Sequence, residues 1–366
     1  MQNHQAQSAN ILIVGAGAMG IITGFILDRA GASVTFLIRP NRKEGLSRPQ
    51  VLYCYDDVSL KHFSGYGVIT DPAQIARDAY DFVILTIDGT ALRSPEGEWL
   101  VKAIGDAARG TKTKVLIGTI GINLRPGFLR LSGLAQDQVF NGGLYILVYQ
   151  ADRVSLPVHP PTDPGLLARA NFAYRHAAEA GIFVDDSALL AANRFAEIWN
   201  ASGMTRCVVL GEQEYSARVP AVFPMFAACD IMGWPSAAVL ATDPELWELA
   251  AQAVREVQGL GVNGEAGKKA QEVTTAEGLL QMCRQLEEET WPLDLWAFNR
   301  FHHGGKVFEQ DVQLLEDCVS LGEAEGQPMS ALKELIGRVR AARGHGDGDV
   351  GTRSSVGWAE RSDVQR

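Results

Sequence analysis

The chain has 366 residues, of which 46% are hydrophobic and 21% charged, and its formal net charge is −10. That length is too great for one ordinary core and fits two domains. The acidic balance disfavours nucleic acid and an anionic membrane as partners, because both attract a basic face. A small anionic substrate remains compatible, since its site needs only local positive charge.

The N-terminal residues "MQNHQAQSAN" lack a basic segment followed by an apolar one, so no signal peptide is expected. No apolar run approaches the roughly 18 residues of a membrane span. The cysteines are scattered, odd in number and never form a CxxC pair: Cys54, Cys207, Cys229, Cys283 and Cys318. This usage indicates reduced, mostly buried thiols in a cytoplasmic protein.

Short apolar runs alternate with helical stretches through the first 150 residues. The runs lie at 11–15, 33–38, 82–87, 114–118 and 144–149. They are almost entirely apolar rather than alternating, which is typical of strands buried on both faces of a parallel sheet. The sequence therefore predicts an α/β fold with a Rossmann-type, doubly wound sheet.

A proline-rich segment, "SLPVHPPTDPG" at 155–165, marks the sharpest change in composition. Proline cannot continue a helix or a central strand, so a domain boundary is expected there. We predict a Rossmann-type α/β domain over 1–155, an all-α second domain over 166–343, and a disordered tail over 344–366. The expected helices are 166–181, 186–204, 245–259, 264–290, 308–323 and 328–343.

A GxGxxG array follows the first expected strand and opens a helix, the context in which this motif is informative. Gly15 permits a tight turn, Gly17 lets the backbone approach a pyrophosphate, and Gly20 lets the helix pack against the sheet. The expected cofactor-binding residues of the turn are therefore Gly15, Ala16, Gly17, Ala18, Met19 and Gly20. The alternative is a glycine-rich turn that binds nothing.

The residue after the second expected strand selects the nucleotide. An acid there holds the ribose hydroxyls of NAD, whereas this chain has Arg39, with Arg42 and Lys43 following. A cation suits the 2′-phosphate of NADP, so NADP is the expected cofactor. A solvated basic turn is the alternative.

Two further strands end in polar residues, at Thr86-Ile87-Asp88 and at Thr119. Ligands of open α/β sheets sit beyond the carboxyl ends of the strands, so Thr86, Ile87 and Thr119 are expected near the cofactor. For Asp88 and Thr119 the competing interpretation is a helix N-cap or turn residue.

Several motifs together resemble the ketopantoate reductase (2-dehydropantoate 2-reductase) family. They are "GAGAMG" with Arg39, "AEAGIFVDDSALLAANRFAEIW", and "GKVFEQD" with "LGEAEGQPMSALKEL". The resemblance covers about residues 10–340. It implies a Rossmann domain, a helical C-terminal domain, and hydride transfer from NADPH to the ketone of a 2-oxo acid. It also implies a lysine after a tryptophan of a central helix as donor to the carbonyl oxygen, and an acid that holds the substrate.

The substrate half departs from that pattern. The tryptophan matches Trp199, but the lysine position falls on Asn200 or Ala201, and Asp88 stands where the family often has a second lysine. Two family asparagines fall on Thr205 and Ile120. The acid transfers to Glu309, with Asp311 behind it.

The stretch "FNRFHHGGKVFEQD" (298–311) then supplies replacement candidates. Adjacent histidines point about 100° apart on a helix, which disfavours a metal site. The stretch is either a turn between two helices, with glycines for φ freedom, or a site for an anion or carbonyl at a helix start. The candidate catalytic residues are Lys306, His303, His302, Glu309 and, on the central helix, Asn200.

Two functions follow. The first is an NADP-dependent reductase of a 2-oxo acid or related carbonyl compound, its substrate differing from ketopantoate. The second is a catalytically silent NADP-binding sensor or scaffold. A homodimer stays open, since Trp291, Trp296 and Phe298 suit a subunit contact or a core.

Overall fold

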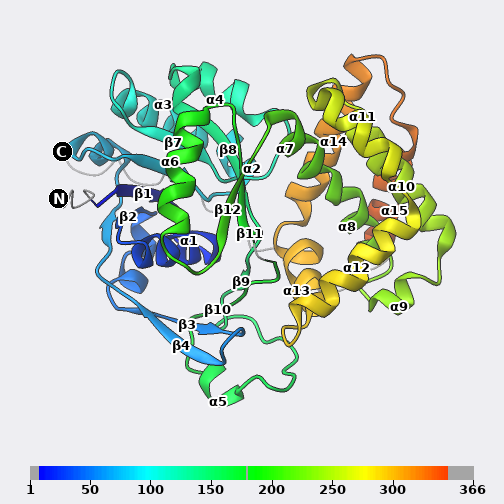
Figure 1. The fold of residues 1–366 in the computed structure, drawn as a ribbon, viewed down its shortest axis with the longest axis horizontal. Coiled ribbons are helices and arrows are strands. Elements are labelled where there is room, and N and C mark those ends of the chain that lie inside the picture. Colours follow the sequence, from blue (N-terminus) through cyan, green and yellow to red (C-terminus); the bar gives the residue numbers. More distant parts are fainter. Residues whose placement is uncertain (1–7, 179, 345–366) are drawn as a thin grey trace, which may run out of the picture.

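The computed structural model describes residues 8–178 and 180–344. Its main sheet has eight strands (Figure 1). In spatial order they are β12 (Arg206–Leu210), β11 (Ala180–Asp185), β8 (Val139–Leu144), β7 (Lys114–Ile117), β6 (Phe82–Leu85), β1 (Asn10–Val14), β2 (Ser33–Leu37) and β5 (Gly67–Ile69). From β8 to β5 the strands are parallel, in the order found in dinucleotide-binding folds.

Helices cover both faces of this sheet. On one face lie α1 (Ala18–Arg29) and α6 (Leu189–Asn200), packed on alternate residues of the strands such as Ile13 and Ile84. On the other lie α3 (Pro95–Ala108) and α4 (Leu124–Ser132), packed on the residues between them. Side chains that alternate across a strand feed two cores, which explains why the strands are apolar throughout. The predicted doubly wound fold is confirmed.

A second, smaller sheet was not predicted from the sequence. Its strand order is β4 (Ser59–Phe63), β3 (Gln50–Cys54), β10 (Phe172–Arg175) and β9 (Leu147–Tyr149). The prediction of a single strand over 144–149 is wrong, because this run contributes to two sheets. Leu144 pairs with β11 in the main sheet, and Leu147–Tyr149 pair with β10 in the small one. An unbroken apolar run does not reveal where a strand changes sheets.

The prediction that the chain becomes helical from residue 166 is also wrong. Only the short α5 (Pro164–Leu167) precedes β10, and β11 and β12 then extend the main sheet on the side of β8. The alanine-rich sequence favours a helix locally, but pairing with strands on both sides overrides that preference. The all-α part therefore begins after Leu210.

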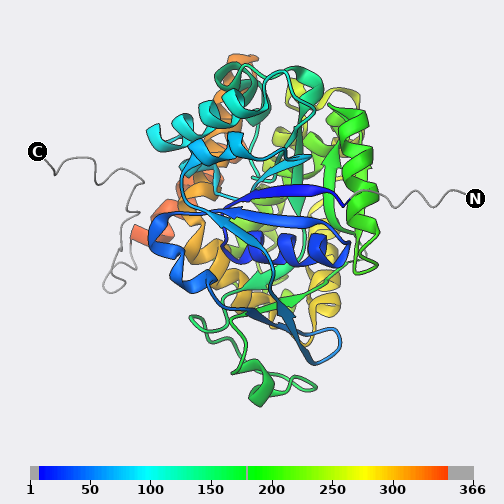
Figure 2. The ribbon, with the colours of Figure 1, turned by 90° about the vertical axis from the view of Figure 1, so that its left-hand side faces the viewer.

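The C-terminal helices surround α10 (Pro244–Gln258), which packs against α8 (Phe223–Ile231), α11 (Gly264–Val273), α12 (Ala276–Thr290) and α15 (Ser330–Gly344). The others are α7 (Glu212–Arg218), α9 (Ala237–Leu240), α13 (Leu295–Phe301) and α14 (Phe308–Ala324). The single helix predicted at 264–290 is two, because Thr275 caps α12 by accepting a hydrogen bond from Gly278 N–H. In Figure 2 these helices lie behind the sheet.

The remaining short helices are α2 (Gly89–Arg93), the 3₁₀ turns Pro40–Arg42, Glu44–Leu46, Pro72–Arg77, Gln136–Gln138, Pro220–Val222 and Gly261–Asn263, and a π-helical turn at His302–Lys306. All five cysteines are buried and free, as predicted. Among the residues described, no helix has the length and apolar character needed to cross a membrane. The predicted disordered tail lies outside the described residues, apart from Gly344, which ends α15.

The proline-rich segment packs against residues 291–294, between α12 and α13. Val158 forms a bridge with Leu293, and the His159 ring stacks on Trp291 with 4.5 Å between ring centroids. His159 also pairs with Asp294, at 3.2 Å, next to the start of α13. The segment thus ties the two parts of the chain together rather than forming a free linker. Trp296 and Phe298 belong to the core, while Trp291 is half exposed.

Candidate active site

The turn between β1 and α1 needs its first and third glycines for steric reasons. Gly15 has φ +103°, and its N–H donates to Leu37 C=O at 2.9 Å. A Cβ on Gly20 would lie 2.1 Å from the Gly15 carbonyl oxygen. The tight turn and the close helix–strand packing predicted for these two residues are therefore present in the structure.

Gly17 precedes α1 and is exposed, and a Cβ there would meet no atom within 4 Å among the described residues. Ala16 and Met19 are half-buried, and Ala18 is buried. The first N–H groups of a helix have no intrahelical partner and carry the positive end of its dipole. Open space at Gly17 thus adjoins a surface suited to an anion.

Arginines gather after β2. The pKa of Arg42 is lowered by burial, and the charges of Arg153 and Arg39 lower it further. Arg42 therefore lies near two other guanidinium groups, and Arg153 comes from the turn that follows β9. Sequence inspection missed Arg153, because it is more than 100 residues away along the chain and carries no motif.

The polar residues at the strand ends have structural partners. The Thr86 hydroxyl donates to Val14 C=O at 3.0 Å, and the Thr119 hydroxyl donates to Ile87 C=O. Asp88 is the N-cap of α2, its carboxylate accepting from Ala91 N–H at 2.6 Å. The competing interpretation of Asp88 as an N-cap is therefore correct, and the ends of β1, β6 and β7 are bonded to one another.

The predicted turn at "HHGGK" is a continuation of α13. His302–Lys306 form a π-helical turn, in which Val307 N–H donates to His302 C=O at 2.9 Å before α14 begins. The glycines were expected to supply φ freedom, and that expectation is wrong, because neither Gly304 nor Gly305 has a positive φ. A Cβ on Gly304 would lie 2.7 Å from Trp234 Nε1, so close approach is the requirement. Such wide turns within helices often occur at functional sites.

A partly buried ionic network holds this turn in place. Asp230 accepts from Arg343 through both carboxylate oxygens, at 2.7 and 3.0 Å, and from Trp234 Nε1 at 2.8 Å. Arg343 also donates to Gly304 C=O and lies over the Phe308 ring, 3.6 Å from its centroid. Bidentate pairing of this kind fixes geometry as well as adding energy. The sequence offered no signal for it, since Asp230 and Arg343 lie on different helices far apart in the chain.

The two histidines face different surroundings. His303 Nδ1 lies 2.7 Å from Asp311 Oδ2, and its ring packs on Phe226 and Trp234. Burial raises the pKa of Asp311, and His303 opposes that shift. The His302 ring stacks on Phe298. Burial, with the charges of His303 and Lys306, lowers the pKa of His302 well below its ordinary value, so its imidazole is neutral at physiological pH.

Lys306 faces the nucleotide-binding half. Lys306 is exposed by surface area, but its ammonium group lies where neighbouring atoms lower its pKa by desolvation, and the negative charge of Asp88 acts in the opposite direction. The same face is bridged by Gln310, which accepts from Gly89 N–H at 3.3 Å, and by an Arg93–Asp317 ion pair at 2.6 Å. Of the predicted candidates, Lys306 is thus the cation beside the carboxyl end of β6.

Asn200 does not lie opposite this surface as expected. Its helix, α6, packs on the sheet through Phe195, whose ring centroid is 5.6 Å from that of Phe82. Figure 1 shows β11 and β12 between α6 and the C-terminal helices. The Asn200 side chain accepts from Cys207 N–H at 2.7 Å, because the chain turns back into β12 immediately after the helix. Glu309 is exposed in the first turn of α14.

The sequence disfavours a metal site at the two adjacent histidines. In the described ranges, no group of three or more His, Cys, Asp or Glu side chains is arranged to hold a metal ion. His303 is instead occupied by Asp311. On α6, Arg194 and Glu197 form an exposed ion pair at 3.1 Å.

The fold and the glycine turn define a protein with a dinucleotide-binding sheet and a helical C-terminal domain. Residues 11–92 match the family model described as "Ketopantoate reductase PanE/ApbA". The resemblance found in the sequence is confirmed over that segment. No curated protein matches the chain in sequence.

Solved structures share the fold over nearly the whole chain. A PanE/ApbA family ketopantoate reductase from Ralstonia eutropha JMP134 is 18% identical, with a TM-score of 0.61, covering 92% of this chain and 99% of its own. A 2-dehydropantoate 2-reductase from Geobacter metallireducens GS-15 is 17% identical, with a TM-score of 0.60 and coverage of 91% and 99%. D-mandelate dehydrogenase with NADH and anilino(oxo)acetate is 14% identical, with a TM-score of 0.63 and coverage of 92% and 98%.

Proposed function

We propose that this chain is an NADP-dependent oxidoreductase that reduces the carbonyl group of a small anion, a 2-oxo acid or a related compound. The observation that carries the proposal is the position of Lys306. Its ammonium group lies close enough to Asp88, at the carboxyl end of β6, for the carboxylate to act on its pKa, and folds of this order bind their ligands at that edge.

The residues of the β1–α1 turn fit a dinucleotide. Gly17 leaves open space before α1, and Gly20 brings the helix onto the strand, so a pyrophosphate has both room and free N–H donors. When bound, a nicotinamide cofactor supplies the hydride. The cluster of Arg39, Arg42 and Arg153 favours the 2′-phosphate of NADP over a bare ribose, because guanidinium groups recognise phosphate by paired hydrogen bonds. The similar D-mandelate dehydrogenase structure is one with NADH. The proposed preference for NADP over NAD therefore rests only on the arginines of this chain.

In this proposal Lys306 donates the proton to the carbonyl oxygen. Its lowered pKa makes the ammonium a better acid, and its charge stabilises the oxyanion as it develops. His303 is held in the core of the helical domain by Asp311 and its aromatic neighbours, so we assign it to support the turn that carries Lys306. Asn200 has its amide bonded to Cys207 and does not replace the family lysine.

A carboxylate on the substrate suits the same surface. Lys306 is a cation in an acidic chain, and Glu309 one turn further on accepts a hydroxyl or amide N–H. The named ligand of the D-mandelate dehydrogenase structure, anilino(oxo)acetate, is an oxo acid. Because Asn200 and Asp88 stand where the ketopantoate reductase pattern has lysines, we propose that the substrate differs from ketopantoate.

The test is NADPH oxidation by the purified protein against 2-oxo acids, aldehydes and imines. We expect turnover on a 2-oxo acid, and Lys306→Ala to lower kcat/KM by about 10²–10⁴-fold while NADPH affinity changes little. Lys333→Ala is the matched control, since Lys333 is an exposed lysine on α15 paired with Glu323. Tight NADPH binding without turnover on any substrate would favour a silent NADP-binding protein instead. Turnover that survives Lys306→Ala would remove Lys306 from the mechanism.

A further inference from the structure

A groove of about 1100 Å³ lies at the opposite edge of the main sheet from the candidate active site. It is lined by residues at the amino ends of three parallel strands, Asn10, Phe82 and Lys114, and by the first turns of α6. The dinucleotide-binding turn and Lys306 belong to the carboxyl edge. The groove is therefore separate from the site already described.

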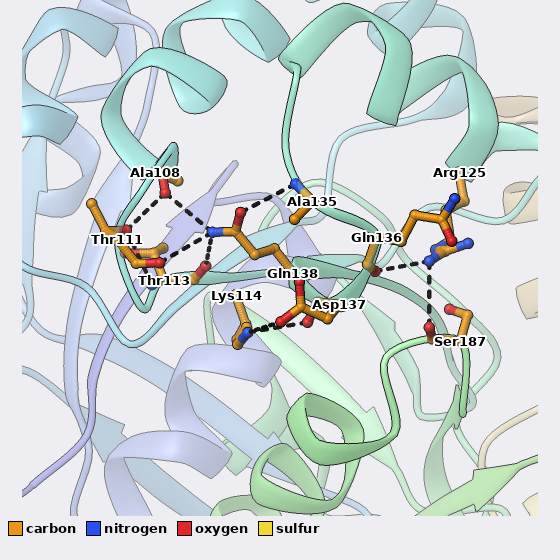
Figure 3. Close-up of polar contacts among 10 residues, drawn as sticks. All are labelled: Ala108, Thr111, Thr113, Lys114, Arg125, Ala135, Gln136, Asp137, Gln138 and Ser187. Carbon is orange, nitrogen blue, oxygen red and sulfur yellow. Dashed lines mark hydrogen bonds and ion pairs between the residues drawn. The ribbon is translucent and has the colours of Figure 1, made fainter.

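The walls of the groove are fixed by hydrogen bonds (Figure 3). Lys114 Nζ lies 3.2 Å from Asp137 Oδ2, and Arg125 donates to Gln136 C=O at 2.8 Å and to Ser187 C=O at 3.3 Å. The amide of Gln138 is buried just behind, bonded to backbone carbonyls. A surface held in this way loses little conformational freedom when it binds a partner.

Two leucines on this face are exposed to solvent. Leu189 is 51% and Leu190 is 85% exposed, and both line the groove with Ala191 and Ile198. Single exposed leucines are ordinary, but an adjacent pair in the first turn of a helix, beside a large groove, is the composition of a contact surface. The face carries both a protruding apolar group and a hollow that could receive one.

The charges on this face balance. Its ionisable lining residues are Asp81, Asp137 and Asp186 against Lys112, Lys114 and Arg194, although the chain as a whole has a net charge of −10. Two copies of an acidic chain repel each other least where such a neutral face meets its own image. A two-fold interface also needs a self-complementary surface, with knob, hollow and both charge signs on one patch.

We propose that this groove is the interface of a homodimer, in which Leu189 and Leu190 of each copy enter the groove of the other. The inference is independent of the proposed enzymatic function, because it uses the far edge of the sheet. It leaves both candidate active sites facing outward and predicts that dimerisation does not require NADPH.

Sedimentation velocity over about a hundredfold range of protein concentration tests the proposal, since dimer content depends on concentration. We expect the wild-type chain to dimerise and Leu190→Asp to raise the dimer dissociation constant at least about tenfold, because each interface would bury two carboxylates. Val273→Asp is the matched control, as Val273 is 76% exposed at the end of α11 in the helical domain. Thermal unfolding of each variant as a monomer checks that the fold is intact.

A wild-type chain that stays monomeric at every concentration would overturn the proposal, whatever else fills the groove. So would a dimer that Leu190→Asp leaves unchanged, or one that Val273→Asp disrupts equally.

Discussion

The imidazole of His303 is bound to the carboxylate of Asp311, 2.7 Å from Nδ1 to Oδ2, inside the helical domain. Sequence reasoning grouped His303 with Lys306 as a replacement for the missing family lysine. The structure separates their surroundings, because the histidine ring packs on Phe226 and Trp234, whereas the lysine lies within the electrostatic influence of Asp88.

This pair predicts a stability effect at His303. We expect His303→Ala to lower the free energy of unfolding by about 3 kcal/mol, because it leaves the Asp311 carboxylate buried without its partner. His303→Asn keeps a polar group at the position and should cost clearly less. Denaturant unfolding of the three proteins measures both values. An alanine variant as stable as the wild type would mean that the pair contributes nothing.

Gly304 offers a sharper steric test. A Cβ there would lie 2.7 Å from Trp234 Nε1, whereas a Cβ on Gly305 would lie 3.6 Å from the Arg300 carbonyl oxygen, an ordinary contact. We therefore expect Gly304→Ala to lower stability by about 1–3 kcal/mol, with Gly305→Ala close to neutral. Thermal melting of both variants gives the comparison. Equal effects would show that the π-helical turn yields easily.

His302 predicts a dependence of stability on pH. Its folded-state pKa lies well below the ordinary value of 6.5, mainly through burial. The contribution of the neutral imidazole is therefore complete above pH 6.5 and is lost as the pH falls toward the folded-state pKa. His302→Phe keeps the stacking on Phe298 and removes the titration. We expect unfolding curves at neutral and mildly acidic pH to show a larger loss in the wild type. Parallel losses would contradict the assignment.

Features that depend on local sequence were predictable. The parallel strands read as apolar runs because both of their faces are buried, and Gly15 and Gly20 stand where the turn has no room for a side chain. The break of the run 144–149 between two sheets depends on pairing with β10 and β11, which are not adjacent to it along the chain. Local preference could not reveal it.

The candidate site was predictable only in part, for the same reason. "HHGGK" identified the turn, but its orientation depends on Asp230 and Arg343, which meet from separate helices. Asn200 was assigned to the site because Trp199 matched a family pattern. The helix that carries both ends at Asn200 and returns as β12, which no motif in the segment indicates.

The arginine cluster predicts cofactor preference. We expect Arg153→Ala to weaken NADPH binding about tenfold and to leave NADH binding within about threefold, since only the former carries the 2′-phosphate. Arg29→Ala is the control, because Arg29 lies at the opposite end of α1 from the glycine turn. Fluorescence titration of both cofactors gives the ratios. Equal loss for NADPH and NADH in Arg153→Ala would place Arg153 outside the phosphate site.

Asp88 and Lys306 together predict the pH profile of the reaction. The charge of Asp88 raises the pKa of Lys306 against the larger lowering by burial. Asp88→Asn removes that charge and keeps the N-cap of α2, since asparagine caps helices as well as aspartate does. The pKa of Lys306 should then fall further. If Lys306 is the proton donor, activity is lost as pH rises through that pKa, so the basic limb of kcat/KM should move to lower pH in the variant.

Asp317→Asn is the control, because the Asp317 carboxylate pairs with Arg93 at the same contact between the two parts of the chain. Comparing the pH profiles of the two variants separates an effect on Lys306 from a general loss of packing. A basic limb that stays in place in Asp88→Asn would assign the titration to a group other than Lys306.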